Sequence, residues 1–586
     1  MILQSLAAYY DRLVEQGKLA KPGWQPVKVS FALQIDRDGR LIRVLPLMNP
    51  ETRGKKQVMV PRIEDLPAQV KRAVGIVSNF LCDNASYMLG VDSKGKPDRT
   101  KNCFEACKAL HMQLLGQINT PAAQAVIRFF EAWEPDDAAN CEAIKPYWDD
   151  ILAGANVLFF FEDRYIHHYP EIQAAWDKYY SDSGDAEKMR CLVTGEYEQI
   201  ARLHPSIKGV AGGQSSGTSL VSFNAAAYES FGRDGGQGLN APVSERAAFA
   251  YSAALNWMIT EKGHHIRLSD MTIVFWAESG MDAYAGLCAS LLGDDESISD
   301  DDLHSAMITL ATGRKALWDE SELNPGERFF ILGLSPNAAR LSVRFFLQST
   351  FGDFAKNLLR HHERLAIERP SFDSRESLSF RQLLNETVNQ NARDKTPSPL
   401  LSGSLMRAVL TDSFYPALLL NQTELRIRAE HVVTRGRAAI IKAYLMQNTK
   451  NDNDYASYKE AVENVNLDEN TAYVPYLLGR LFAVLEGLQQ AANPGINTTI
   501  RDRYFNSACA TPAVVFPQLI KLAQAHLNKL NTGSRIYYEK QIIDITGQMS
   551  QEYPARFNLR DQGIFQLGYY HQTQKRFTKK EEKDNG

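Results

Sequence analysis

The order of hydrophobic and polar residues predicts β-structure over much of the first part of the chain. Residues 29–47 alternate apolar and polar side chains around Asp38-Gly39, a dipeptide that suits the positive φ of a tight hairpin turn. Short apolar runs predict further strands at 56–61, 157–161, 271–277 and 328–332. Helical patterns lie at 1–17, at 67–87 and after a basic loop at 94–108. We therefore expect this part to mix helices and strands without regular βαβ repetition.

The pattern changes in the second part of the chain, because strand signals fade beyond Pro336. Residues 368–405 have the Ser, Pro and Asp content of linkers and loops. Farther on, leucines recur at helical spacing, as at Leu477, Leu481, Leu485 and Leu488. We predict an α+β fold with a mixed α/β N-terminal domain over 1–375, connecting helices and linker over 376–445, and a helical bundle over 446–586 that ends in a disordered tail at 575–586.

Composition narrows the class of protein. The length of 586 residues suggests two or three domains. The 65 basic and 69 acidic residues give a net charge of −4, so a nucleic-acid-binding surface has to be local. Seven scattered cysteines, an odd number, suit free thiols in a reducing cytoplasm. The apolar runs have strand length only, which predicts that the chain does not enter a membrane.

Residues 191–257 contain Gly, Ser, Asn and Gln at a density that predicts a ligand surface built from backbone and uncharged side chains. Its sequence GGQSSGTS lacks the Lys of a P-loop, so ATP hydrolysis is not supported. The amides could instead form an anion-binding nest, although a merely flexible loop fits the same composition. The candidates for contacting nucleic acid here are Lys208, Gln214, Ser215, Ser216, Asn224, Arg233, Gln237 and Asn240. Asn224 and Asn240 suit caps or turns equally well.

Three groups of basic residues are candidates for phosphate contacts. The first group is Lys94, Lys96, Arg99 and Lys101, and it is equally compatible with a solvated charged loop. The second is Arg340 and Arg344, which are one turn apart if their segment is helical. The third surrounds the helical part, suits a track for single-stranded DNA, and contains Arg426, Arg428, Arg435 and Arg437.

Metal and catalytic motifs are weak. Cys103, Cys107 and His111 would share one helical face, with Cys82 as a conceivable fourth ligand, but buried core thiols explain this spacing better than zinc does. Histidine doublets such as His167-His168 lack HExxH spacing, and adjacent side chains diverge on a helix or strand. We expect no catalytic residue, metal or cofactor, and hence no enzyme. A nucleotide- or metal-dependent nucleic-acid enzyme using the Gly/Ser-rich loop is the alternative, and a scaffold that contacts only protein is a third.

Several motifs occur in an order that resembles a known family. They are Thr194-Gly195-Glu196, HPSIKG at 204–209, QSSG at 214–217, SFN at 222–224 and NAPVS at 240–244. Further matches are FLCDN at 80–84 and GLSPNAARLS at 333–342. Together they resemble the large subunit of the type I-C CRISPR Cascade surveillance complex over essentially the whole chain.

The resemblance implies a function and a set of partners. A large subunit of this kind is expected to recognise the protospacer-adjacent motif beside the DNA target, which makes the eight Gly-rich-region candidates flank readers. It is also expected to stabilise the R-loop and the displaced strand. The implied partners are the guide crRNA, target double-stranded DNA, the backbone, guide-end and small subunits, and a separate helicase-nuclease recruited afterwards. The C-terminal helices would resemble the small subunit, and a shorter product could start internally, for example at Met446.

Overall fold

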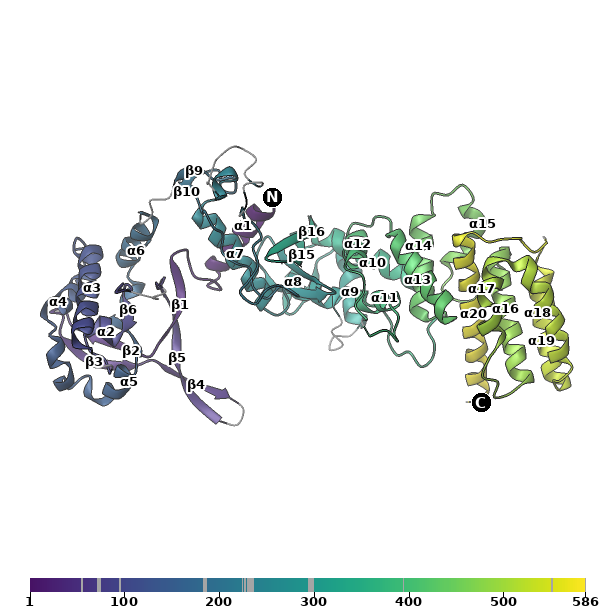
Figure 1. Cartoon of the computed structure of the whole chain (residues 1–586), viewed down its shortest axis with the longest axis horizontal. Helices are drawn as coiled ribbons and strands as arrows, with labels where there is room; N and C mark the ends of the chain where they lie inside the picture. Colours follow the sequence, from purple (N-terminus) through teal and green to yellow (C-terminus); the bar gives the residue numbers. More distant parts are fainter. Residues whose placement is uncertain are drawn as a thin grey trace. The chain divides into compact units, whose positions relative to one another are not determined.

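The computed structural model describes the chain except for residues 54–55, 71–74, 94–95, 183–186, 224, 226–227, 229–236, 294–299, 394, 550–551 and 585–586. Strands and helices mix in the first part and helices dominate the C-terminal half, which confirms the predicted α+β class (Figure 1). The chain divides into two compact units. The large unit contains 1–5, 205–222 and 254–586, and the small unit contains 6–204 and 223–253. The three predicted domain ranges stay a prediction.

The small unit contains a five-stranded sheet and a separate three-stranded sheet. In the larger sheet, β2 pairs antiparallel with β3 and parallel with β7, and β6 and β8 both pair with β7. The smaller sheet has the order β1-β5-β4. The strands are β1 (Trp24–Val29), β2 (Phe31–Ile35), β3 (Leu41–Pro46), β4 (Met48–Arg53), β5 (Lys56–Pro67), β6 (Cys82–Asn84), β7 (Asn156–Phe161) and β8 (Arg164–Tyr165), and a short hairpin joins β9 (Lys188–Arg190) to β10 (Tyr197–Gln199).

Helices complete the small unit and bury its aromatic core. Phe129 and Phe130 pack edge to face on Phe159 of the central strand β7. The elements are α2 (Ala85–Met88), α3 (Pro97–Leu115), α4 (Pro121–Ala132), α5 (Trp148–Leu152), α6 (Pro170–Asp182) and the 3₁₀ turns η1 (Pro135–Asn140), η2 (Lys145–Tyr147), η3 (Ile166–His168) and η5 (Gln237–Asn240), while α1 (Ile2–Glu15) and α7 (Glu245–Thr260) carry residues of both units.

The predicted hairpin at Asp38-Gly39 is confirmed as the β2–β3 connection. Gly39 has a φ of +79°, and a Cβ there would lie 2.3 Å from the backbone nitrogen of Phe129. Asp36 Oδ1 accepts hydrogen bonds from the amides of Asp38 and Arg40, which fixes the turn. Glycine is therefore required both by the turn and by the close approach of α4.

Two local predictions in the small unit are wrong. Residues 67–87 are not one helix, because the described part holds an irregular segment, β6 and the single turn α2. Polar side chains set this path: the Asp83 carboxylate accepts from the amides of Asn79 and Asn84, and Leu81 adopts a φ of +63°. The basic stretch that was expected to be a loop becomes helical at Pro97, which occupies the first turn of α3.

The large unit is built on a four-stranded antiparallel sheet with the order β11-β12-β15-β16. All seven residues of β12 are buried. The predicted loss of strands beyond Pro336 is wrong, because β16 pairs along the whole of β15 and carries Arg340 and Arg344 on a strand rather than a helix. The elements up to this point are β11 (His265–Leu268), β12 (Met271–Ala277), α8 (Asp282–Leu292), α9 (Asp300–Ala311), β13 (Ala316–Trp318), β14 (Ser321–Leu323), β15 (Arg328–Asn337) and β16 (Arg340–Thr350).

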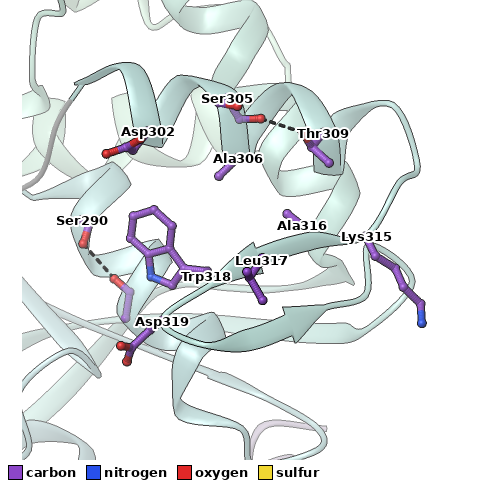
Figure 2. A pocket seen from close by; sticks show the side chains of 11 residues that line it. Ser290, Asp302, Ser305, Ala306, Thr309, Lys315, Ala316, Leu317, Trp318 and Asp319 are labelled. Atoms are coloured by element: carbon purple, nitrogen blue, oxygen red, sulfur yellow. Dashed lines mark hydrogen bonds between the residues drawn. The ribbon is translucent and has the colours of Figure 1, made fainter.

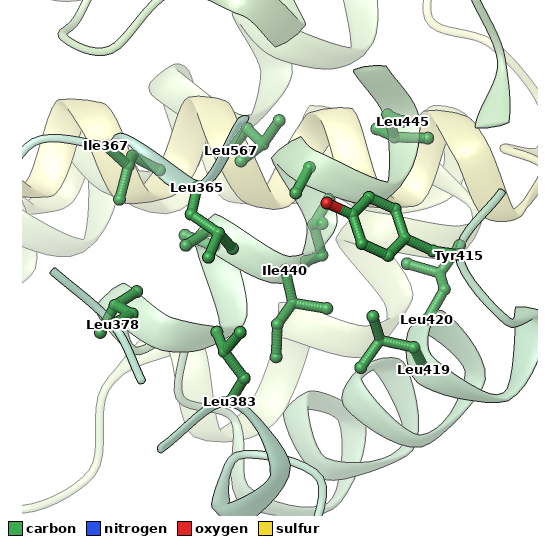
Figure 3. Packing of buried hydrophobic residues seen from close by; sticks show 14 of the residues in the cluster. Leu365, Ile367, Leu378, Leu383, Tyr415, Leu419, Leu420, Ile440, Leu445 and Leu567 are labelled. Carbon is green, nitrogen blue, oxygen red and sulfur yellow. The ribbon is translucent and has the colours of Figure 1, made fainter. Parts of the chain in front are cut away.

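One hydrophobic core runs from this sheet into the C-terminal helices. The segment 368–405, which was predicted to be a linker, contributes Leu378, Leu383 and Leu401 to that core, and Figure 3 shows the first two among the packed side chains. The helices are α10 (Phe351–Leu365), α11 (Phe380–Asn385), α12 (Pro399–Leu410), α13 (Ala417–Glu430), α14 (Arg435–Asn448), α15 (Tyr455–Glu463), α16 (Val474–Ala492), α17 (Ile500–Ala510), α18 (Pro512–Leu527), α19 (Thr532–Gly547) and α20 (Leu559–Asp584).

Helices α16 and α20 lie side by side in the C-terminal bundle (Figure 1). Small residues permit this contact: a Cβ on Gly479 would lie 1.9 Å from the Phe565 carbonyl oxygen, and one on Gly568 would lie 2.2 Å from that of Tyr476. Helix α20 extends as far as Asp584, with Lys575 ion-paired to Glu469, and the disordered tail at 575–586 stays a prediction. None of the described helices has the length and apolar character needed to span a membrane.

Gly479→Ala is expected to lower the free energy of unfolding by about 1–3 kcal/mol, because α16 and α20 would have to move apart. The measurement is urea denaturation followed by circular dichroism. Gly547→Ala on α19 is the matched control, since its Cβ would meet no atom within 4 Å and alanine favours a helix. Equal midpoints for the two variants would contradict this packing.

Glu424 on α13 is buried and accepts a hydrogen bond from Gln566 Nε2 at 2.8 Å. Burial raises the pKa of this carboxyl from 4.5 to about 7. The native state therefore keeps a proton that the unfolded chain releases, and stability falls as the pH rises from about 4.5 to about 7.

Replacing the ionisable group should remove this pH-dependent loss. We expect Glu424→Gln to stabilise the protein at pH 8, by up to roughly 3 kcal/mol, and to have little effect at pH 4.5. Thermal melts at both pH values measure the difference. The exposed Glu460→Gln serves as the control. A gain that is the same at both pH values would show that titration of Glu424 is not its cause.

Candidate nucleic-acid interface

The Gly/Ser-rich segment 205–222 is attached to the edge of the large unit's sheet. The buried residues Ile207 and Thr218 exchange backbone hydrogen bonds, both of 2.8 Å. Ser219 then pairs with the start of β16: its amide donates to the Ala339 carbonyl, and its carbonyl accepts from the Leu341 amide, each at 2.9 Å. The segment is therefore an ordered extension of the sheet rather than the merely flexible loop that its composition left open.

Two side chains hold the base of this segment. Asn256 of α7 accepts the Lys208 amide on Oδ1 at 2.8 Å and donates from Nδ2 to the Ser206 carbonyl at 3.1 Å. Thr272 of β12 accepts the Ala211 amide on its hydroxyl at 2.9 Å. Because both anchors belong to regular elements, the tip of the segment is presented in a fixed position.

The tip is a tight turn with exposed polar groups. The Gly217 amide donates to the Gln214 carbonyl at 2.9 Å, and Gly217 has a φ of +102°. Gln214, Ser215 and Ser216 are exposed, and no described residue accepts a hydrogen bond from the amides of Ser215 or Ser216. The turn thus offers two backbone amides, two hydroxyls and one amide side chain to a ligand.

Positive charge lies next to this turn. Lys208 is exposed, and its Cγ would be 3.3 Å from a Cβ placed on Gly217, so the two residues lie side by side. Arg267 of β11 is also exposed and donates to the Gly209 carbonyl at 3.3 Å. No local sequence signal marks Arg267, because only the fold brings β11 to this segment. We call Lys208, Gln214, Ser215, Ser216 and Arg267 the loop surface.

Of the other predicted flank readers, the structure describes Asn240 and the backbone of Gln237. Asn240 belongs to the small unit, where its Nδ2 donates to the Tyr228 carbonyl at 2.6 Å, as expected for a turn residue. Gln237 begins η5 in the same unit. The side chain of Gln237 and the whole of Asn224 and Arg233 lie outside the described residues.

The arginine pair on β16 contributes in two different ways. The backbone of Arg340 forms the bridge to Ser219 and so borders the loop surface. Arg344 donates from Nε to the Ser335 hydroxyl at 3.0 Å and lies 3.5 Å from Asp270. Arg344 is therefore held against neighbouring strand and turn residues and remains only partly exposed.

The start of α3 presents a second basic surface, in the small unit. Lys96, Arg99 and Lys101 are exposed there, and Lys94 lies outside the described residues. Cations at the N-terminus of a helix oppose its dipole, whereas an anion at the same place is stabilised by it. A bound phosphate would therefore relieve the repulsion among these groups. We call these three residues the α3 surface.

The arginines of the helical part are mostly engaged inside the fold. Arg437 is buried, ion-pairs with Glu430 and donates to the Val432 carbonyl at 2.9 Å. Arg435 pairs with Asp373 at 3.0 Å, and Arg426 with Glu430 at 3.6 Å. Arg428, which is half-exposed, donates to Gln562 at 2.7 Å. Arg435 and Arg437 therefore stabilise the helices, and phosphate could reach them only by breaking these ion pairs.

The Cys/His face of α3 is part of the core, as the preferred interpretation of its spacing predicted. Cys103, Cys107 and His111 are buried. His111 Nε2 accepts from the Leu81 amide at 3.0 Å, so Nδ1 carries the proton and donates to the Cys107 carbonyl at 2.8 Å. Burial lowers the pKa of His111 to about 4. This neutral histidine with both nitrogens bonded is a structural residue.

A cavity of about 640 Å³ lies between α8, α9 and the β13–β14 hairpin. Figure 2 shows the Trp318 side chain between α9 and the hairpin. Asp302 and Asp319 line the cavity, and the lysine there, Lys315, is ion-paired with Glu322 at 2.6 Å. This acidic lining repels phosphate, so the loop surface and the α3 surface are the better candidates for nucleic acid.

Asn256→Ala should release the base of the loop surface. We expect faster amide hydrogen exchange over 206–218, with a loss of about 1–3 kcal/mol of local protection, because the Lys208 amide and the Ser206 carbonyl lose their partner. Exchange followed by mass spectrometry measures this. Glu261→Ala, an exposed position just beyond α7, is the control. Unchanged exchange in Asn256→Ala would mean that the two hydrogen bonds of the Asn256 side chain do not hold the segment.

Comparison with known proteins gives the chain a family. A model of the CRISPR-associated protein (Cas_Csd1) family matches residues 6–577, which is nearly the whole chain. No protein with a curated description matches it. The match includes the loop surface and the α3 surface as well as the C-terminal helices. The chain therefore belongs to the Cas_Csd1 family of CRISPR-associated proteins and is a Cascade-type component.

Proposed function

We propose that this chain is the large subunit of a type I-C RNA-guided surveillance complex and that its loop surface recognises the protospacer-adjacent motif. The observation that carries the proposal is the rigid, exposed turn at Gln214–Gly217 beside Lys208. A site that reads a short DNA flank needs donors and acceptors at fixed positions, because base edges are distinguished by the geometry of hydrogen bonds.

The residues of the loop surface divide by chemistry. The Gln214 amide can donate and accept at once, so it is suited to a base edge. The hydroxyls and amides of Ser215 and Ser216 suit either a base or a phosphate oxygen. Lys208 and Arg267 supply the charge that positions the backbone of the duplex. The α3 surface would bind phosphates of the guide crRNA or of the DNA.

The proposed mechanism is binding without bond cleavage. Flank contacts loosen the neighbouring base pairs, pairing between crRNA and target supplies the remaining specificity, and stabilisation of the displaced strand favours a nearly balanced strand exchange. The chain would assemble with backbone, guide-end and small subunits. A separate helicase-nuclease, recruited after target binding, would cut the DNA.

Binding of the reconstituted complex to target duplexes with every flank sequence tests the proposal. The complex contains crRNA and all partner subunits. We expect Gln214→Ala to change which flanks are preferred, because a base contact is lost, with about 1–3 kcal/mol less discrimination at the affected position. We expect Lys208→Ala to weaken binding to all flanks alike and to reduce the slope of log affinity against log salt by about one.

Controls separate this outcome from a general loss of charge. Lys356→Ala removes an exposed lysine of α10 in the same unit and should leave both the preference and the salt slope unchanged. If flank preference in Gln214→Ala matches that of the unaltered complex, with assembly intact, the loop surface is not the reader. If the purified chain alone cleaves DNA, the non-catalytic mechanism is wrong.

A further inference from the structure

Glu64, His167 and His168 form a cluster in the small unit and are not part of the loop surface or of the α3 surface. Glu64 lies on β5 of the three-stranded sheet, and the two histidines lie on η3, directly after β8 of the five-stranded sheet. One ligand atom from each residue lies within 4.8 Å of the other two. Glu64 and His167 are buried, and His168 is exposed. Two of the three side chains are therefore shielded from solvent, and the third is open to it.

One buried nitrogen of the cluster makes no hydrogen bond with the described residues. His167 is 2% exposed, and its Nε2 makes no hydrogen bond with any described residue, although Glu64 Oε2 lies 3.5 Å away. A buried polar atom that lacks a partner costs free energy. A cation between Nε2 and Oε2 would coordinate both atoms and remove that cost.

Local structure brings the two histidine rings close together. Adjacent side chains diverge on a helix or a strand, which made the doublet a poor ligand pair from sequence alone. In η3 the two rings instead lie 4.2 Å apart between centroids, at an angle of 64°. Tyr165 stacks on His167 at 5.7 Å and restricts its rotation. The doublet can therefore contribute two nitrogens to one site.

Arg62 orients the Glu64 carboxylate through one of its two oxygens. Its guanidinium ion-pairs with Glu64 Oε1 and lies 5.1 Å from the centre of the Tyr165 ring. Oε2 is the oxygen that faces His167. Partners outside the ligand set commonly fix ligating carboxylates in this way. The positive charge of Arg62 also opposes a cation, so the site should bind more weakly than one without it.

We propose that Glu64, His167 and His168 bind one divalent transition-metal ion of the Zn²⁺ class through two nitrogens and one oxygen, with water completing the coordination. Three protein ligands of this composition, with one open position, suit zinc and its neighbours. The ion would connect the β1-β5-β4 sheet to the end of the β7–β8 hairpin. This role is independent of the loop surface and of flank recognition.

Titration of the tag-free, chelator-treated full chain with Co²⁺, followed by visible absorption, tests the proposal. We expect saturation at about one ion per chain, with bands typical of a nitrogen- and oxygen-ligated site, and displacement by Zn²⁺. His168→Ala and Glu64→Gln should each weaken binding at least about 10-fold. His304→Ala, which removes an exposed histidine of α9, should leave the affinity unchanged.

Thermal melts with and without Zn²⁺ give a second measurement. The ion should raise the melting temperature of the unaltered chain and of His304→Ala but not that of His168→Ala, because binding to the native state alone stabilises it. His168 is exposed, so its removal should leave the fold intact. Absence of saturable Co²⁺ binding, or equal affinity in His168→Ala, Glu64→Gln and the unaltered chain, would overturn the proposal.

Discussion

The candidate interface depends on the backbone hydrogen bonds that join the Gly/Ser-rich segment to the edge of the sheet β11-β12-β15-β16. Ile207 pairs with Thr218, and Ser219 continues the ladder onto the start of β16. A stretch with so many glycines would otherwise lose much conformational entropy on ordering. Because the sheet offsets that loss, the polar tip can be both rigid and exposed, which is the combination that recognition of a base edge requires.

The protein uses its arginines and lysines in two distinct ways, which explains how a chain of net charge −4 can present basic surfaces. Within the helical part, Arg435 and Arg437 ion-pair with the partly buried carboxylates of Asp373 and Glu430. Lys208, Arg267 and the cations at the start of α3 remain exposed. Charge composition therefore says little about binding until burial has separated structural cations from available ones.

The histidines also divide into structural residues and residues available to a ligand. His111 has both ring nitrogens hydrogen-bonded within the aromatic core and is neutral there. The buried His167 instead has a nitrogen that faces a carboxylate and makes no hydrogen bond with any described residue. From sequence alone His111 was the better candidate for a metal ligand, since it shares a helical face with two cysteines. What distinguishes the two is Glu64, which is about 100 residues away in sequence and is brought close by the pairing of β5 with β1.

The sequence by itself determined the features that depend on near neighbours. Alternation and Asp38-Gly39 predicted the β2–β3 hairpin, apolar runs located β7 and β12, and leucine spacing predicted the C-terminal helices, because each signal acts within a few residues. Four residues of the loop surface were also recognised from composition and motif order. The tertiary structure decided what depends on distant partners: β16 as a strand, the packing of 368–405 into the core, Arg267 beside the loop, and the burial of Arg437. Long-range contacts override local preference in each case, since free energy comes from pairing and burial that no short window of sequence contains.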